Sequence, residues 1–307
     1  MKNERIVFMG TPNISAQYLS ALIKNHYNII AVYTQPAKRQ DRGMDLKNTP
    51  VQNLSIVENI PCFTPEILKD QNEINKFENL KIDVAIIMGY GMLIPKEFLN
   101  IPKLGCINIH LSLLPRWRGA SPIEHSLMCG DGETGVTIFR LNEKFDCGPI
   151  LNSIKFKISN TETKEDLQKN LNSLGIDLLL ATLPKYLKQE ISLKKQDDSQ
   201  ATYAKKIFSQ DRKINFSQKK KEIYNFVRSF SPKPGAWFTF KGEKIKILSC
   251  ETNSIMGNKS TILSNNLDIG CEDGSIKPIM IQREGKKIMN INQFIRGFNF
   301  KVGDQIH

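Results

Sequence analysis

The sequence predicts an α/β protein whose first part contains a parallel sheet and whose last part is a smaller β-barrel-like domain. An apolar run at 5–9, a Gly-Thr-Pro turn, a helical pattern over 13–23 and a second apolar run at 28–34 form one strand–helix–strand unit, which is typical of parallel sheets. Beyond residue 230 the pattern changes to short alternating runs separated by Gly or Asn, which is typical of small barrels. The 307 residues exceed one typical domain of roughly 100–200 residues.

Composition and motifs argue against several classes of protein. The first apolar run ends at Gly10-Thr11-Pro12, so we expect no secretory signal, and no run approaches the roughly 20 residues of a membrane span. The six cysteines are widely spaced, so we expect no zinc site and reduced thiols in a cytoplasmic protein. The opening unit lacks Gly-x-Gly-x-x-Gly, which argues against a dinucleotide oxidoreductase.

Residues 35–50 form a long polar segment with almost no apolar side chain. Its charged residues include Lys38, Arg39, Arg42 and Lys47. Long loops in compact domains are usually functional or disordered, and the local pattern leaves both open.

The apolar run 83–88 predicts a buried strand that ends in Gly89-Tyr90-Gly91-Met92. Two glycines around a tyrosine allow a ligand to approach the backbone closely, so the N–H and C=O groups of this loop can recognise the edge of a flat heterocycle. A tight turn without a ligand is the alternative.

A second buried strand is predicted at 105–109, and a loop and a helical pattern over 120–129 follow it. Asn108 and His110 are two residues apart, so their side chains point to the same side of the strand. Ligands of open α/β sheets gather at the carboxyl ends of strands, where an amide and an imidazole can polarise a carbonyl and handle a proton. A capping Asn and a surface His are the alternative.

Asp146 stands in a predicted turn between strands at 134–141 and 150–156. A carboxylate there can orient a histidine or accept a proton through water, although a turn-stabilising Asp is the simpler interpretation. Leucines then recur at 167, 171, 174 and 178, a helical spacing that predicts a core helix.

The hydrophobic pattern is lost over 190–205, which predicts a linker between domains at 1–189 and 206–307. Residues 190–307 hold 21 basic and 12 acidic side chains, a net charge of +9, against +3 for the rest of the chain. This asymmetry favours a polyanionic partner, nucleic acid before a membrane surface, over a merely lysine-rich surface. In this part we expect a basic helix at 219–230, a short helix at 290–296 and several strands. These strands are 236–240, 243–249, 260–263 and 276–281.

The central motif is Asn-x-His-x-Ser-Leu-Leu-Pro-x-x-x-Gly over 108–119, and Asp146-x-Gly148 follows it. Together they resemble the signature of the formyltransferases that use 10-formyltetrahydrofolate. The resemblance covers nearly the whole chain, including the opening at 7–12, the long polar segment and the segment 226–238. Within this superfamily it is strongest to the members that act on initiator methionyl-tRNA.

The resemblance implies a doubly wound, mostly parallel, Rossmann-like sheet with an OB-like C-terminal barrel that holds tRNA. The implied reaction transfers the formyl group of 10-formyltetrahydrofolate to the α-amino group of methionine on initiator methionyl-tRNA, for translation initiation. We expect a cytoplasmic monomer that uses no metal and no membrane.

By the same resemblance, the long polar segment enters the tRNA acceptor end. The implied catalytic residues are Asn108, His110 and Asp146. The implied folate contacts are Met88, Gly89, Tyr90, Gly91, Met92, Ser112, Leu113, Leu114 and Pro115. The expected tRNA contacts are Arg39, Arg42, Lys206 and Arg228.

In this assignment Asn108 and His110 stabilise the formyl oxygen, and Asp146 orients His110 and helps to remove the amine's proton. Four residues depart from the family pattern: Leu111 replaces a glycine at a position that varies across the superfamily, Met44 and Asp45 replace lysines of the long segment, and Asn215 replaces an aspartate. Two alternatives remain open. One is a formyltransferase for a small amine, such as glycinamide ribonucleotide or an amino-sugar nucleotide, and the other is a nucleic-acid-binding module on an inactive scaffold.

Overall fold

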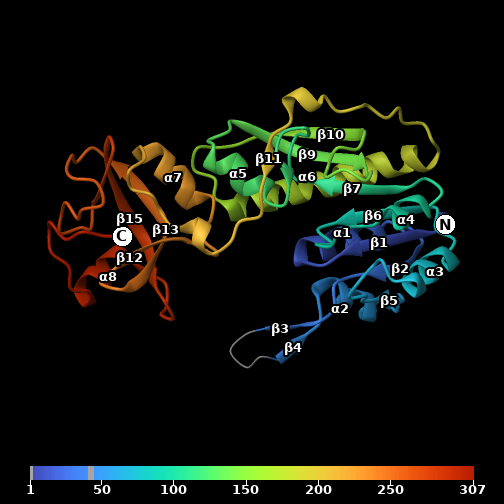
Figure 1. The fold of residues 1–307 in the computed structure, drawn as a ribbon, viewed down its shortest axis with the longest axis horizontal. Helices are drawn as coiled ribbons and strands as arrows, with labels where there is room; N and C mark the ends of the chain where they lie inside the picture. The colour runs from blue at the N-terminus through green and yellow to red at the C-terminus, as the bar shows by residue number, and fades with distance from the viewer. Residues whose placement is uncertain (1–2, 41–44) are drawn as a thin grey trace. The chain divides into compact units, whose positions relative to one another are not determined.

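The computed structural model describes residues 3–40 and 45–307 (Figure 1). Arg42 and Met44 lie outside the described residues. The chain forms two compact units. Unit 1 comprises Met1–Arg118, Gly135–Lys155 and Leu171–Tyr203, and unit 2 comprises Gly119–Thr134, Phe156–Asn170 and Ala204–His307. The division of the sequence at 189 and 206 stays a prediction, since unit 2 also takes in two earlier segments.

A seven-stranded sheet in the order β10-β9-β7-β6-β1-β2-β5 confirms the predicted α/β class. Its strands are β1 (Ile6–Gly10), β2 (Ile29–Tyr33), β5 (Cys62–Phe63), β6 (Val84–Met88), β7 (Cys106–His110), β9 (Glu133–Arg140) and β10 (Ile150–Lys157). The pairs β1–β2, β1–β6, β6–β7 and β2–β5 are parallel, whereas β9 runs antiparallel to β7. The carboxyl ends of β1, β6 and β7 therefore share one edge of the sheet.

Helices and strands in this part of the chain form where the sequence buries apolar faces. All five residues of β1 and of β6 are buried, as expected for strands that are covered on both faces. In α1 the buried Tyr18, Leu19 and Leu22 recur at helical spacing. The helices are α1 (Asn13–Lys24), α2 (Pro50–Val57), α3 (Gln71–Asn79), α4 (Lys96–Asn100), α5 (Pro122–Met128) and α6 (Lys164–Leu187).

The long polar segment is more regular than the sequence suggested. Its ends form two short antiparallel strands, β3 (Lys38–Gln40) and β4 (Asp45–Lys47), which extend beyond α2 in Figure 1. The segment stops where Thr49 caps α2, because its hydroxyl accepts a hydrogen bond from Gln52 N at 3.0 Å. We therefore correct the expected open loop to a β-ribbon.

Unit 2 contains a curled antiparallel sheet in the order β12-β13-β15-β14, with β16 paired to β15. Irregularities in the β13–β15 register near Ser249 accompany the curl, and the result agrees with the predicted small barrel. The expected strand 260–263 is instead a pair of isolated bridges at Thr261 and Ile262. The strands are β12 (Ala236–Phe240), β13 (Glu243–Asn253), β14 (Ile269–Cys271), β15 (Gly274–Arg283) and β16 (Met289–Asn290).

Two helices accompany this sheet, α7 (Lys220–Arg228) and α8 (Ile291–Gly297). Short elements complete the chain. They are β8 (Arg118–Gly119), β11 (Tyr203–Ala204), η1 (Asp198–Gln200) and η2 (Gln210–Arg212). Of the helices in the described part of the chain, none has the length and apolar character that a membrane crossing requires.

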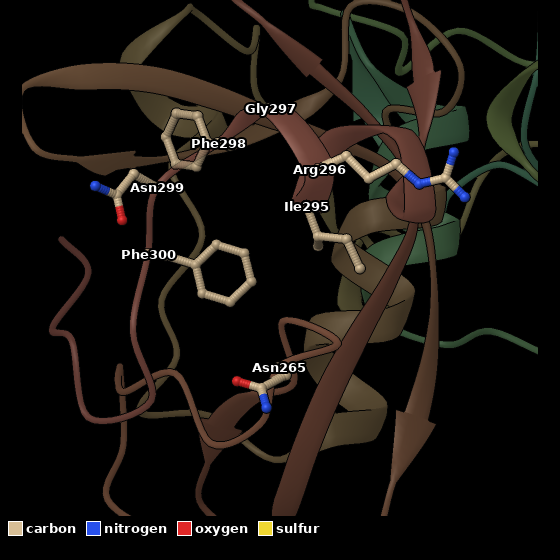
Figure 2. Close-up of a pocket in the computed structure, with 7 residues that line it drawn as sticks. All are labelled: Asn265, Ile295, Arg296, Gly297, Phe298, Asn299 and Phe300. Atoms are coloured by element: carbon tan, nitrogen blue, oxygen red, sulfur yellow. The ribbon is translucent and has the colours of Figure 1, made fainter.

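An open pocket follows α8 in unit 2 (Figure 2). It is lined by Asn265, Ile295, Arg296, Gly297, Phe298, Asn299 and Phe300. The Phe298 ring stacks on buried Phe294 with centroids 4.5 Å apart, and Phe300 also packs against the core of the unit. Figure 2 shows Arg296 extending away from both rings. Core packing explains these aromatic residues, so we assign no ligand to the pocket.

Candidate active site

Strand β7 carries the two polar side chains on which the site depends. Asn108 pairs with Ile87 of β6 on one side and with Phe139 of β9 on the other, so it stands on a central, well-supported strand. Asn108 and His110 project from the same face because side chains alternate along a strand. Asn108 is half-buried, and its side chain makes no hydrogen bond to any residue in the described ranges. Its amide is therefore available to a ligand.

The His110 ring is buried, with 6% of the residue exposed, and is held in one orientation. Its Nε2 donates a hydrogen bond to the Trp117 carbonyl oxygen at 2.8 Å, since a carbonyl can only accept. The neutral imidazole therefore carries its proton on Nε2 and its lone pair on Nδ1. The Trp117 carbonyl therefore helps to orient the ring, and the orienting role expected of Asp146 stays a prediction.

The Asp146 carboxylate faces the other ring nitrogen. Its Oδ2 lies 3.8 Å from His110 Nδ1, too long for a hydrogen bond but within ion-pair range. Its side chain is only 13% exposed. Once Nδ1 accepts a proton, the resulting imidazolium has a carboxylate beside it. The structure thus brings together an imidazole and a carboxylate that are separated by 36 positions in the sequence.

The loop that carries Asp146 depends on a close approach of two backbone segments. Asp146 has a φ of +48°, in the left-handed region that Asp tolerates better than most residues. Arg140 N donates to Pro149 O at 2.9 Å, which closes the loop. A Cβ atom on Gly148 would lie 1.7 Å from the Arg140 carbonyl oxygen, so only glycine fits there.

We expect Gly148→Ala to displace the Asp146 loop. The added methyl group collides with backbone, so the variant should lose about 1–3 kcal/mol of unfolding free energy together with much of its turnover. Thermal unfolding and steady-state kinetics measure the two effects. Gly132→Ala is the matched control, because a Cβ there meets nothing within 4 Å. A Gly148→Ala protein with normal turnover would show that the placement of this loop is unimportant.

A threonine that the sequence did not single out fixes the segment after His110. The Thr137 hydroxyl donates to Ser112 O at 2.7 Å and accepts from Leu114 N at 3.1 Å. Ser112 is fully buried, and its own hydroxyl donates to Arg116 O at 2.6 Å. Ser112 therefore shapes this loop from inside, and the partly exposed members of the expected folate segment are Leu113 and Pro115.

The glycine-rich loop after β6 can present backbone groups to a ligand, but it does not present the Tyr90 ring for stacking. Tyr90 is 2% exposed within the core, where burial raises its pKa, and its carbonyl oxygen accepts from Thr11 Oγ1 at 2.8 Å and from Gln35 Nε2 at 3.1 Å. Met88 is also buried. Gly89 and Gly91 have φ of +59° and +81° and are exposed, while Met92 is half-buried. The groups of this loop that can meet a ligand belong to these last three residues.

The structure describes some of the residues that are expected to contact tRNA. The backbone of Arg39 lies in β3, and Arg42 falls outside the described residues. Lys206 is exposed, with its ammonium 5.5 Å from the centre of the Phe208 ring.

The expectation for Arg228 is wrong, because this residue is 5% exposed. Its Nε donates to Asn225 Oδ1 at 2.9 Å, and its Nη1 donates to Ser159 O at 3.0 Å and to Glu162 O at 3.1 Å. Burial lowers the pKa of this guanidinium. Arg228 therefore cross-links unit 2 internally, and its guanidinium is engaged by protein groups.

A basic cluster around Trp237, which the sequence did not reveal, lies on unit 2. Lys244 Nζ lies 4.5 Å and Lys213 Nζ 6.0 Å from the Trp237 ring centre. The indole Nε1 donates to Ser209 O at 2.8 Å, which fixes the ring. Only the tertiary structure shows these lysines together, since they come from segments 31 positions apart.

The sheet and its polar residues define an α/β group-transfer enzyme, with an amide that can stabilise an oxyanion and an imidazole–carboxylate pair that can take a proton. The family model for formyl transferase matches residues 4–183, and that for the formyl transferase C-terminal domain matches residues 206–299. The chain belongs to the formyl transferase family.

Proteins named methionyl-tRNA formyltransferase are similar along the full length. The one from Pelagibacter ubique is 40% identical over 305 residues, covering 99% of this chain and 98% of the relative. The one from Brucella melitensis is 38% identical over 298 residues, covering 95% and 97%.

Solved structures share the fold at lower identity. An N-formyltransferase from Helicobacter canadensis, in complex with folinic acid and dTDP-3-aminofucose, has a TM-score of 0.65 and 21% identity, with 92% of this chain and 100% of that chain covered. HypX from Aquifex aeolicus, in complex with tetrahydrofolic acid, has a TM-score of 0.66 and 16% identity, with 98% and 50% covered.

Proposed function

We infer that this protein transfers the formyl group of 10-formyltetrahydrofolate to the α-amino group of methionine on initiator methionyl-tRNA. The observation that carries this proposal is the similarity of 38–40% identity to proteins named methionyl-tRNA formyltransferase, which extends through both family domains. A cytoplasmic monomer that uses no metal is part of the same proposal.

The geometry of the site suggests how the reaction proceeds. The amine attacks the formyl carbon, and negative charge develops on the formyl oxygen, to which the Asn108 amide donates a hydrogen bond. Because Nε2 of His110 is committed to Trp117, Nδ1 takes the proton from the attacking amine, and the Asp146 carboxylate stabilises the imidazolium. The C–N bond to the folate then breaks, and the His110 imidazolium returns its proton to the departing folate nitrogen. No covalent bond to the enzyme forms at any step.

The folate donor is assigned to the exposed parts of two loops that follow parallel neighbouring strands. Gly89, Gly91 and Met92 follow β6, and Leu113 and Pro115 follow β7. Both loops start at the same edge of the sheet, where ligands of open α/β folds bind. Two solved relatives were determined in complex with folinic acid and with tetrahydrofolic acid, which supports a folate at this edge.

The nature of the amine acceptor distinguishes this proposal from a sugar or small-amine formyltransferase. Purified protein is incubated with 10-formyltetrahydrofolate and, in separate reactions, initiator methionyl-tRNA, glycinamide ribonucleotide or an amino-sugar nucleotide. We expect formylated methionine, released from the tRNA, as the product. Preferential formylation of either small amine would replace the proposed acceptor, and no formylation of any amine would reject the activity.

We expect tRNA binding to weaken steeply with salt, because basic side chains displace counterions from phosphates. Besides Arg39, Arg42 and Lys206, we assign Lys213 and Lys244 of the Trp237 cluster to this role. Lys213→Gln with Lys244→Gln should reduce the slope of log K against log salt by about 2.

Filter binding at several salt concentrations measures this slope. Lys24→Gln with Lys188→Gln is the control, since both lysines are exposed and lie in the other unit. Binding that did not respond to salt would mean that the basic surface serves another purpose.

A further inference from the structure

A buried glutamine lies in the segment that the sequence predicted to be a linker. Gln196 is only 5% exposed and belongs to unit 1. Its Nε2 donates to Asp146 O at 2.9 Å and to Gly148 O at 2.7 Å. Its Oε1 accepts from Arg118 Nε at 3.1 Å and from Arg118 Nη2 at 2.8 Å. Both amide hydrogens and both oxygen lone pairs are therefore used.

We propose that Gln196 is a positioning residue for formyl transfer, which fixes the Asp146 carboxylate beside His110 by joining the Asp146 loop to the Arg118 guanidinium. The inference rests on the role proposed above for Asp146. Gln196 itself touches neither His110 nor the Asp146 carboxylate in the contacts of the described chain; it acts through the backbone of the loop.

Arg118 gives the Gln196 amide a single orientation. A guanidinium only donates hydrogen bonds, so it must face Oε1, and the two backbone carbonyls only accept, so they must face Nε2. Rotating the amide by 180° would place donors against donors and oxygen against oxygen. The Gln196 amide therefore has only one orientation that satisfies its hydrogen bonds, so the position of Arg118 fixes the position of the loop.

Arg118 is itself firmly anchored. It is 2% exposed, and its Nη2 donates to Asp198 Oδ1 at 2.7 Å. Burial opposes its charge, but the hydrogen bond to Asp198 and further interactions with Cys147, Tyr203 and Asp198 hold the pKa of the guanidinium above its usual value. A buried charge without partners would strongly destabilise the protein, so breaking the Arg118 hydrogen bonds would be energetically costly.

A short stretch of backbone connects the hydrogen bonds of Gln196 to the Asp146 carboxylate beside His110. The two carbonyls that Gln196 binds flank Cys147, and the Asp146 carboxylate lies 3.8 Å from His110 Nδ1. A displacement of about 1 Å at a reacting group can cost roughly 100-fold in rate. Loosening this loop should therefore affect the chemical step more than the binding of either substrate.

Gln196→Glu is the sharpest variant because its shape is nearly unchanged. The carboxylate keeps its attraction to Arg118 but turns an oxygen towards the two carbonyls, so the loop is repelled. We expect kcat to fall by about 10- to 100-fold, with KM for 10-formyltetrahydrofolate and for the tRNA nearly constant. We also expect the pH–rate profile to move, since the carboxylate beside His110 has moved.

Gln196→Asn, which keeps the amide but shortens the side chain, should lose less, and it remains available if Gln196→Glu does not fold. Gln200→Glu is the matched control, since Gln200 is exposed in the same segment and, within the described residues, its side-chain amide donates only to Asp197. Circular dichroism and thermal unfolding establish that each variant is folded.

A double-variant cycle with Asp146→Asn separates positioning from a structural role. If Gln196 acts through Asp146, Gln196→Glu should cause little further loss of kcat in the Asp146→Asn background. The same fold-loss in both backgrounds, or normal kcat and pH profile in folded Gln196→Glu, overturns the inference while leaving the proposed activity in place. Normal turnover of Asp146→Asn alone instead removes the proposed role of Asp146, and with it this inference.

Discussion

Replacing His110 with asparagine is expected to lower the turnover of formyl transfer by about 10²- to 10⁴-fold, the range that a positioned proton-transfer group contributes. Asparagine is polar and of comparable size, but it cannot accept the amine's proton. Trp117 O holds Nε2 at 2.8 Å, so in the proposed mechanism Nδ1 performs this step. Single-turnover kinetics with 10-formyltetrahydrofolate and initiator methionyl-tRNA isolate the chemical step.

A second histidine provides the control for this variant. His26 is exposed after α1, far along the chain from the site, with a φ of +58° that asparagine tolerates. His26→Asn should keep normal turnover. Losing a buried imidazole also affects packing against Phe139, whose ring centre lies 6.4 Å from that of His110, so thermal unfolding accompanies the kinetics. Unchanged turnover in a folded His110→Asn protein would remove His110 from the mechanism.

The second large effect is expected at Asn108, whose amide faces no protein partner in the described chain. In the proposed mechanism, Asn108→Ala removes a donor that acts on charge formed only in the transition state. We expect kcat to fall by about 10²- to 10³-fold, or roughly 3–4 kcal/mol. KM should change little, because the ground-state carbonyl oxygen is a weaker acceptor than the oxyanion.

Asn108→Asp sharpens the test, since it keeps the shape and replaces the donor by an acceptor. It should lose at least as much activity as Asn108→Ala, because a carboxylate repels the developing oxyanion. Asn215→Asp makes the same chemical change at an exposed site where the side chain accepts from Ser217 N at 3.0 Å, which a carboxylate also does. If Asn108→Asp matched this control in kcat, oxyanion stabilisation by Asn108 would be excluded.

Local patterns predicted six of the seven strands of the large sheet, all but β5, and five of the eight α-helices in the described chain. They also predicted that Asn108 and His110 lie on one face of their strand. They succeeded because each depends on alternation or helical spacing within a few residues, and because β1 and β6 are uninterrupted apolar runs. The same patterns failed at 35–50, where two three-residue strands have too few side chains to show a period.

Side-chain environment was harder to predict than secondary structure. Arg228 lies on a basic helix and was expected to contact tRNA, but its guanidinium donates to the carbonyl oxygens of Ser159 and Glu162. Gln196 lies in a segment without hydrophobic pattern, yet it is buried between Arg118 and the Asp146 loop. Neither outcome has a local signal in the sequence. The carbonyls that bind Arg228 are 66 and 69 residues away, and Gln196 is 78 residues from Arg118 and 50 from Asp146.

By itself, the sequence determined the α/β class, the family motif and the residue types that can handle a formyl group and an amine proton. These follow from covalent order and from the periods of strands and helices. Only the tertiary structure decided that Nδ1 of His110 is the nitrogen facing Asp146, that Trp117 holds the ring, and that Gln196 supports the loop. Those facts depend on hydrogen bonds between groups far apart in the chain, whose distances and directions exist only once the sheet and its loops have packed.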